Sequence, residues 1–255
     1  MNLLHVRHAT SIITYAGVKI LVDPVFAPKE TYNAIPLTPN RRQNPLVDLS
    51  TSMDIILDVD FILNTHIHND HFDMVAYDVL NKELPVLCQE EDEISIREKG
   101  FVNVFPIQKH ICYGTITITR VAAQHGCGEI GKRMGIASGY ILQSEGEPTL
   151  YITGDTIYND TIKSNIGDYN PQILLINAGS PKFLNSNQIV MNIMDLEKAV
   201  LVNPDLVFIV VHLDAFNHCI ETREDIREYF SEERLHEMGV KSFFVPEDNE
   251  LMENI

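Results

Sequence analysis

The segment from Thr65 to Asp73 places the strongest constraint on the fold, because it carries three histidines and two aspartates within eight residues. It directly follows an apolar run, Phe61-Ile62-Leu63, which is typical of a short buried strand. Burying so many polar side chains beside a strand is unfavourable unless they share a partner. Imidazole nitrogens and carboxylate oxygens are ligands that zinc, manganese and iron accept. The segment therefore predicts a metal site at the end of a strand.

Further ligand candidates follow other predicted strands: His125 after 115–121, Asp155 after 149–153 and His212 after 206–211. A hydrolytic site with two metal ions needs about three protein ligands for each ion and a bridging group. The order of the residues allows His66, His68 and His125 to share one ion, Asp70, His71 and His212 to share the other, and Asp155 to bridge them. His218 lies six residues after His212, so the choice of the last ligand stays open.

Length and charge restrict the class of protein. The 255 residues, 45% of them hydrophobic, suit a single domain over 1–255 built from two similar halves, about 1–125 and 126–255. A net charge of −17 disfavours nucleic acid and anionic membranes as partners. No apolar run approaches the roughly 20 residues that span a bilayer, and the N-terminus does not resemble a signal peptide. We expect a cytoplasmic protein that acts on a small molecule, either as a monomer or as a homo-oligomer.

The four cysteines, at positions 88, 112, 127 and 219, form no C-x-x-C pair. A disulfide framework is not expected in a cytoplasmic chain of this length. Cys127 and Cys219 lie close to candidate histidines, but the imidazole and carboxylate set is sufficient without them.

Hydrophobic periodicity predicts strands and helices in both halves of the chain. The predicted strands cover 11–15, 18–22, 61–65, 85–88, 101–107, 115–121, 138–143, 149–153, 173–176, 206–211 and 242–245. The predicted helices cover 74–82, 91–99, 159–166, 195–202 with Asp195 as its cap, and one long helix over 221–238 closed by Gly239. Residues 27–50 predict a long surface loop. This pattern indicates two packed sheets with helices outside.

The run from His66 to His71 resembles the H-x-H-x-D-H signature of the metallo-β-lactamase-fold superfamily. Further motifs, in the same order, resemble the branch that contains L-ascorbate-6-phosphate lactonase-like proteins. They are Arg7-His8-Ala9-Thr10 with Ile20-Leu21-Val22-Asp23-Pro24, Gln124-His125-Gly126, Tyr151-Ile152-Thr153-Gly154-Asp155-Thr156, and Val211-His212 with Asn217-His218-Cys219. His8 departs from the pattern, because close relatives often have asparagine there.

The resemblance implies an α/β (α+β) fold, a four-layer αββα sandwich with two divalent metal ions at one edge. It implies zinc first, with manganese or iron as alternatives. It assigns His66, His68 and His125 to one ion, Asp70, His71 and His212 to the other, and Asp155 as the bridge. Asp70 and His218 are then the catalytic candidates, with His218 facing the substrate as a proton donor.

The expected function is metal-dependent hydrolysis of a small ester, lactone or phosphodiester by a hydroxide that two metal ions share. Two alternatives remain: diiron chemistry with oxygen or nitric oxide, and a non-catalytic metal-dependent binding protein. Arg41 and Arg42 in the 27–50 loop, and Lys182 in the 179–190 loop, are candidates to bind a phosphate or carboxylate.

Overall fold

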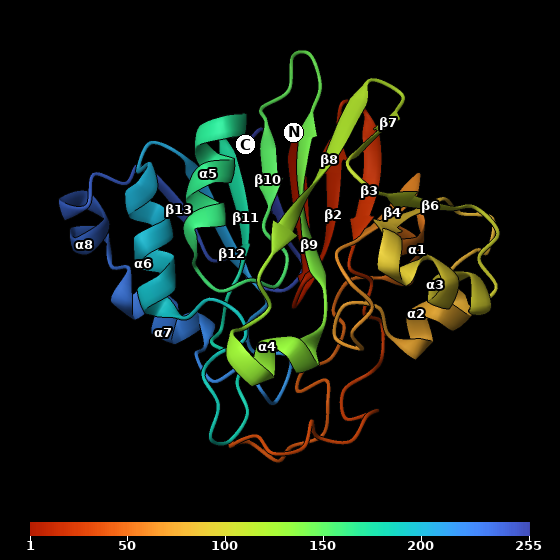
Figure 1. Ribbon diagram of the computed structural model, residues 1–255, viewed down its shortest axis with the longest axis horizontal. Coiled ribbons are helices and arrows are strands. Elements are labelled where there is room, and N and C mark those ends of the chain that lie inside the picture. The colour runs from red at the N-terminus through yellow and green to blue at the C-terminus, as the bar shows by residue number, and fades with distance from the viewer.

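Two seven-stranded β-sheets stack face to face, and helices cover their outer faces, in the computed structural model of residues 1–255 (Figure 1). The first sheet has the order β14-β1-β2-β3-β4-β5-β6. Its strands are β1 (Asn2–Arg7), β2 (Thr10–Tyr15), β3 (Val18–Val22), β4 (Phe61–Asn64), β5 (Val86–Gln89), β6 (Val104–Ile107) and β14 (Glu250–Met252).

The second sheet has the order β13-β12-β11-β10-β9-β8-β7. Its strands are β7 (His110–Tyr113), β8 (Ile116–Ala123), β9 (Ala137–Gln143), β10 (Leu150–Ile152), β11 (Ile173–Asn177), β12 (Val207–Val211) and β13 (Ser242–Phe244). Both sheets combine three antiparallel pairs with three parallel pairs, in the same order from β14 to β6 and from β7 to β13.

The helices lie on opposite sides of this pair of sheets (Figure 1). Beside the first sheet are α1 (Met53–Leu57), α2 (Met74–Val79), the 3-10 helix η1 (Glu90–Asp92) and α3 (Glu93–Glu98). Beside the second sheet are α5 (Asp160–Tyr169), α6 (Ile193–Val202), α7 (Arg223–Tyr229) and α8 (Glu232–Glu237), whereas α4 (Gly128–Met134) lies at one end of the sheets. The four layers are those of the expected αββα sandwich.

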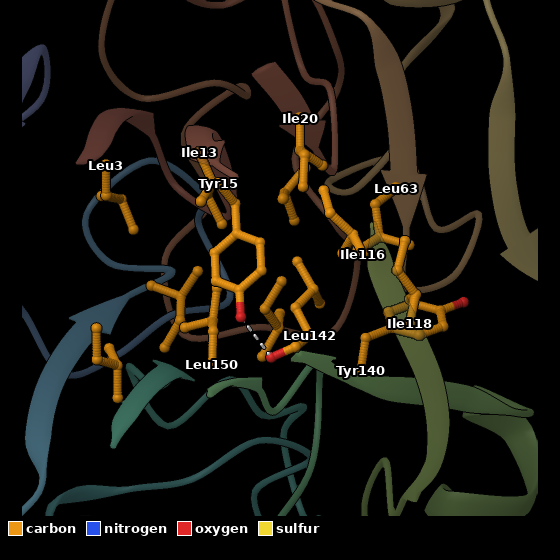
Figure 2. Packing of buried hydrophobic residues seen from close by; sticks show 14 of the residues in the cluster. Leu3, Ile13, Tyr15, Ile20, Leu63, Ile116, Ile118, Tyr140, Leu142 and Leu150 are labelled. Carbon is orange, nitrogen blue, oxygen red and sulfur yellow. Dashed lines mark hydrogen bonds between the residues drawn. The ribbon is translucent and has the colours of Figure 1, made fainter. Parts of the chain in front are cut away.

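Alternating side chains of both sheets form the central hydrophobic core. Ile13, Ile20 and Leu63 of the first sheet meet Ile118 and Leu142 of the second, and all five are fully buried (Figure 2). Tyr15 reaches across this layer and donates a hydrogen bond from its hydroxyl to the Leu142 carbonyl, at 3.0 Å. Separate cores lie between each sheet and its own helices. Because both faces are covered at the centre of each sheet, central strands such as β4, β11 and β12 are apolar runs, whereas β7 and β8 at the edge of the second sheet alternate.

The structure corrects two predictions about helices and adds elements that were not predicted. The helix predicted over 221–238 is two helices, α7 and α8, because Ser231 interrupts it and accepts a hydrogen bond from the Arg234 amide as the cap of α8. The cap of α6 is Asn192, which accepts from the Asp195 amide, so Asp195 lies in the first turn instead. Strand β1 and helix α4 were not predicted, and both lie beside residues of the site described below.

Residues 23–52 contain no helix or strand, as expected for the predicted loop, apart from an isolated antiparallel bridge between Tyr32 and Asn44. This loop runs along the same end of the sheets as the 179–190 loop (Figure 1), and the Leu184 amide donates to the Leu37 carbonyl. None of the helices has the length and apolar character needed to cross a membrane.

Candidate metal centre

The seven predicted ligands meet in one cluster, and each lies in a loop that follows a strand. His66, His68, Asp70 and His71 follow β4, whereas His125, Asp155 and His212 follow β8, β10 and β12. All are buried except His68, which is partly exposed. The strands hold the loops at a rigid edge, so residues far apart in sequence converge without a long-range tether.

Three histidine nitrogens form the first ligand group. His68 Nδ1 lies 3.0 Å from His66 Nε2 and 3.3 Å from His125 Nε2. The opposite nitrogen of His125 lies 2.9 Å from the Ile189 carbonyl, so it carries the proton and leaves a lone pair on Nε2. His66 Nδ1 lies 3.1 Å from the Thr65 hydroxyl. Lone pairs that converge at this spacing fit a divalent cation between them.

The second group contains Asp70, His71 and His212. His71 Nδ1 lies 2.8 Å from Asp23 Oδ2, and His212 Nδ1 lies 3.1 Å from the Ala178 carbonyl. The remaining nitrogens, Nε2 of both rings, are buried and have no hydrogen-bond partner. A buried polar atom without a partner is costly, and a bound metal ion would supply the missing partner.

Asp155 joins the two groups. Its Oδ2 lies 3.2 Å from His71 Nε2 and 3.6 Å from His125 Nε2, and its Oδ1 lies 3.7 Å from His212 Nε2. The preceding residue, Gly154, has φ 61°, and a Cβ on it would lie 2.3 Å from the Ser138 carbonyl oxygen. Only glycine therefore allows the backbone path that brings Asp155 to this place. The donor set therefore fits two metal ions that share one carboxylate.

The electrostatics of the cluster suit metal binding. Burial lowers the pKa of His66 well below its ordinary value and the pKa of His125 to about 4, so both rings are neutral at pH 7. Burial opposes the proton on His71 as well, but the carboxylates of Asp155 and Asp23 raise its pKa to about 10. The two carboxylates thus stabilise positive charge at the centre. A bound metal cation would supply this charge in place of the proton on His71.

His212 and His218 occupy different positions. His212 Nε2 lies within the second ligand group, 3.8 Å from Asp70 Oδ2. His218 Nε2 lies 3.2 Å from the same oxygen, and its side chain lines the cavity above the cluster. The geometry thus separates a ligand-like position, that of His212, from a position that faces the cavity.

Three site residues were not assigned a role by the sequence. Asp23 follows β3 and holds His71, Asn177 ends β11 and donates to Asp155 Oδ1 at 2.8 Å, and His8 follows β1 beside Asp70. Each of them ends a strand, as the ligands do, and this shared position is the signal that would have found them. Neither Cys127 nor Cys219 joins a ligand group, although Cys219 Sγ lies 3.7 Å from His212 Nδ1.

A cavity of about 490 Å³ opens above the cluster. Its floor is formed by polar residues, namely His68, Asn69, Asp70, His125 and His218. Its walls come from the 23–52 loop and from the second half of the chain: Tyr32, Asn33, Ala34, Ile35, Pro36, Asn44, Met134, Phe183, Ile189 and Phe216. Arg41, Arg42 and Lys182 are not among the residues that line this cavity.

Residues 18–212 match the beta-lactamase superfamily domain. The chain belongs to this superfamily. It is 35% identical over 254 residues to the UPF0173 protein YddR of Bacillus subtilis, covering 98% of each chain. It is 30% identical over 191 residues to a UPF0173 metal-dependent hydrolase of Koribacter versatilis, covering 71% of this chain and 73% of the other.

A solved structure is also similar, that of an isothiocyanate hydrolase from Delia radicum gut bacteria. The TM-score is 0.92 at 28% identity, and the match covers 99% of this chain and 98% of that one. The predicted metallo-β-lactamase fold is therefore confirmed, and the chain belongs to the UPF0173 group, whose member in Koribacter versatilis is named a metal-dependent hydrolase. The finer resemblance to the lactonase-like branch stays a prediction.

Proposed function

We propose that this hydrolase holds two divalent metal ions and acts on a small, uncharged electrophile. Two ligand groups that share Asp155 support a dinuclear site, and the cavity above them supports a small-molecule substrate. Bound divalent cations supply Lewis acidity, which makes a water molecule nucleophilic near neutral pH. Zinc is the first candidate, and manganese or iron also suit nitrogen and carboxylate ligands.

The chain's own residues hold and orient the reacting groups in this proposal. His66, His68 and His125 would hold one ion, Asp70, His71 and His212 would hold the other, and the Asp155 carboxylate, which lies near both groups, would contribute to each. Hydrogen bonds to the rear nitrogens of these rings fix which nitrogen faces the metal. His218 is the proton donor to the leaving group, because it faces the cavity while Asp70, 3.2 Å away, orients its ring.

The residues that line the cavity indicate which class of substrate it fits. No lysine or arginine is among its 15 residues, and apolar side chains form much of its wall. A phosphate group is normally held by arginine or lysine, and a net charge of −17 repels anions on average. Among the predicted substrates, this composition favours an uncharged ester or lactone over a phosphodiester.

Isothiocyanates join the candidate substrates, because they are small and uncharged and because a structural neighbour is named an isothiocyanate hydrolase. In such a reaction, water adds to the central carbon of the –N=C=S group. The carbon–nitrogen bond then breaks, and an amine and carbonyl sulfide are released. The nitrogen takes a proton as it leaves, which is the role proposed for His218.

Elemental analysis followed by a hydrolysis panel tests the proposal. The panel contains uncharged esters, lactones and aryl isothiocyanates, each paired with an analogue that carries a carboxylate or phosphate. We expect two metal ions per chain and a preference for the uncharged member of each pair. Asp155→Asn should lose metal and reduce kcat/KM by more than about 100-fold without unfolding the chain.

The control is Asp168→Asn, because Asp168 is an exposed aspartate of α5 and should leave both readouts unchanged. Full turnover by Asp155→Asn would contradict the dinuclear mechanism, and preference for anionic substrates would contradict the substrate class. Iron together with oxygen uptake, without hydrolysis, would support the diiron alternative. Bound metal without any turnover would support a binding protein.

A further inference from the structure

His8 lies against the second ligand group, in the turn between β1 and β2. Its side chain is fully buried, and neither of its ring nitrogens has a hydrogen-bond partner. Its backbone has φ 58°, in the left-handed region that a residue with a side chain rarely adopts. A strained backbone and an unpartnered buried imidazole both cost stability, so the position is explained if the ring has a partner.

The ring of His8 faces the metal ligands. Its Nε2 lies 3.7 Å from Asp70 Oδ2, and its ring centre lies 3.8 Å from that of His212. Ligand atoms of His8, Asp70, His71 and His212 all lie within 4.8 Å of one another. Atoms that bind one ion at about 2.0–2.2 Å lie up to roughly 4 Å apart, so a small contraction would place all four around a single ion.

The turn is also fixed to the strand that supplies the last ligand. The His212 amide donates a hydrogen bond to the His8 carbonyl at 2.9 Å. This bond holds the two backbones beside each other, and the two rings lie side by side with their centres 3.8 Å apart. Phe216 packs against the His8 ring as well, with ring centres 4.6 Å apart.

We propose that His8 Nε2 is an additional ligand of the second metal ion; this inference rests on the proposed dinuclear site. The second ion then has five protein ligands: His8, Asp70, His71, His212 and Asp155. The first has four: His66, His68, His125 and Asp155. With the water molecule added, four protein ligands would make a five-coordinate site, which zinc accepts, whereas five protein ligands would suit an ion that accepts six positions, such as manganese, iron or cobalt.

The two sites also differ in access. His68 and His125 of the first group line the cavity, whereas only Asp70 of the second group does. We therefore expect the second ion to be the more tightly held of the two and the first to exchange more readily. His8 contributes to that difference because it adds a ligand on the buried side.

Calorimetric titration of the metal-free protein with Co²⁺ alone tests the inference. Wild type should bind two ions. His8→Phe keeps an aromatic ring of similar size and removes the nitrogens, and it should bind one ion as wild type does and the other about 10–100-fold more weakly. The matched control is His110→Phe, because His110 is an exposed histidine of β7 and its loss should change neither affinity.

Chemical unfolding of the same proteins gives a second readout. Because His8→Phe removes two unpartnered buried nitrogens, the metal-free variant should be at least as stable as metal-free wild type, and it should gain less stability from Co²⁺. Two ions bound with unchanged affinity, together with a less stable metal-free variant, would overturn the inference and leave His8 as a packing residue. If wild type itself binds fewer than two ions, the proposed dinuclear function fails instead.

A crystal structure of wild type with Co²⁺ decides the matter if His8→Phe does not fold. Anomalous scattering would locate the ions. A His8 Nε2 within about 2.3 Å of the second ion supports the inference. A His8 Nε2 that lies outside coordination distance of both ions overturns the inference.

Discussion

The Asp23 carboxylate supports the metal cluster without being one of its predicted ligands. Its Oδ1 accepts from the Thr65 amide at 2.8 Å and from Asn64 Nδ2 at 3.0 Å, and its Oδ2 lies 2.8 Å from His71 Nδ1. A carboxylate in this place fixes the ring orientation and raises the basicity of the nitrogen that faces the metal. Asp23 therefore controls how well His71 can bind.

Asp23→Asn should weaken metal binding by about 10–100-fold, because an amide cannot accept from His71 and from Thr65 as a carboxylate does. Competition with a chelator measures the affinity, and circular dichroism checks that the fold is retained. Asp54→Asn, at an exposed position of α1, is the control and should change nothing. Wild-type affinity in Asp23→Asn would show that the His71 ring is fixed by packing alone.

Asp92, which belongs to neither ligand group, provides a pH-dependent test. Burial raises the pKa of its carboxyl to about 6, although the hydrogen bond from Gln89 Nε2 opposes the shift. Because this pKa is above its ordinary value, the folded state binds more protons than the unfolded state at mildly acidic pH. The contribution of Asp92 to the free energy of unfolding is therefore lost as pH rises through about 6.

Asp92→Asn should remove that loss. We expect the variant to gain stability relative to wild type by on the order of 1 kcal/mol between pH 5 and pH 8. Urea unfolding at both pH values measures the difference, with Glu98→Gln at the exposed end of α3 as a control. A difference that does not change with pH would mean that Asp92 is ionised without penalty in the folded protein.

The seven predicted ligands could be singled out from the sequence because they are chemically distinctive and lie in loops that follow apolar strands, and the structure brings them into one cluster. The role of Asp23 could not be predicted in this way, because its contact with His71 depends on the parallel pairing of β3 with β4, across about forty residues of intervening chain. The sequence also could not show which residues of the 27–50 loop face the site: Tyr32 and Asn44 line the cavity, whereas the arginines at 41 and 42 do not. A residue's place in a loop does not determine where its side chain points.

At the scale of elements, the break between α7 and α8 shows what periodicity cannot detect. The apolar spacing over 221–238 continues across the break, because Ile226 and Phe230 pack into the same core, with Leu235 against it. What ends α7 is local chemistry at Ser231, whose hydroxyl accepts from the Arg234 amide. Serine competes with helical hydrogen bonding and is favoured at caps.

Ser231→Ala distinguishes one continuous helix from two helices capped at Ser231, because the substitution should change the free energy of unfolding in opposite directions in the two cases. In one continuous helix, alanine would stabilise the protein by a few tenths of a kcal/mol through its higher helix propensity. At a helix cap, the same change should destabilise it by about 1 kcal/mol. We expect destabilisation in a denaturant titration, and a gain in stability would favour the single helix.

At the scale of the whole molecule, two tyrosines tie the sheets together in opposite directions. Tyr15 of the first sheet donates to the Leu142 carbonyl of the second, as Figure 2 shows. Tyr140 of the second sheet donates to the Asn64 carbonyl of the first, at 3.1 Å. Layering of two sheets could be predicted from the order of strands and helices. The return of β14 to the first sheet could not, because a strand of three residues is specified by its partners more than by its own sequence.

Tyr140 matters for the site because Asn64 ends β4, immediately before the segment that carries four of the proposed ligands. Tyr140→Phe removes the hydroxyl and leaves a buried carbonyl without this partner, which should cost about 1–3 kcal/mol of unfolding free energy. Urea unfolding measures the change, and Tyr158→Phe, whose hydroxyl is in a half-exposed side chain, should stay within about 0.5 kcal/mol of wild type. If the tie also positions the ligand segment, Tyr140→Phe weakens metal binding as well; a loss of stability with unchanged metal affinity would show that β4 alone fixes the loop.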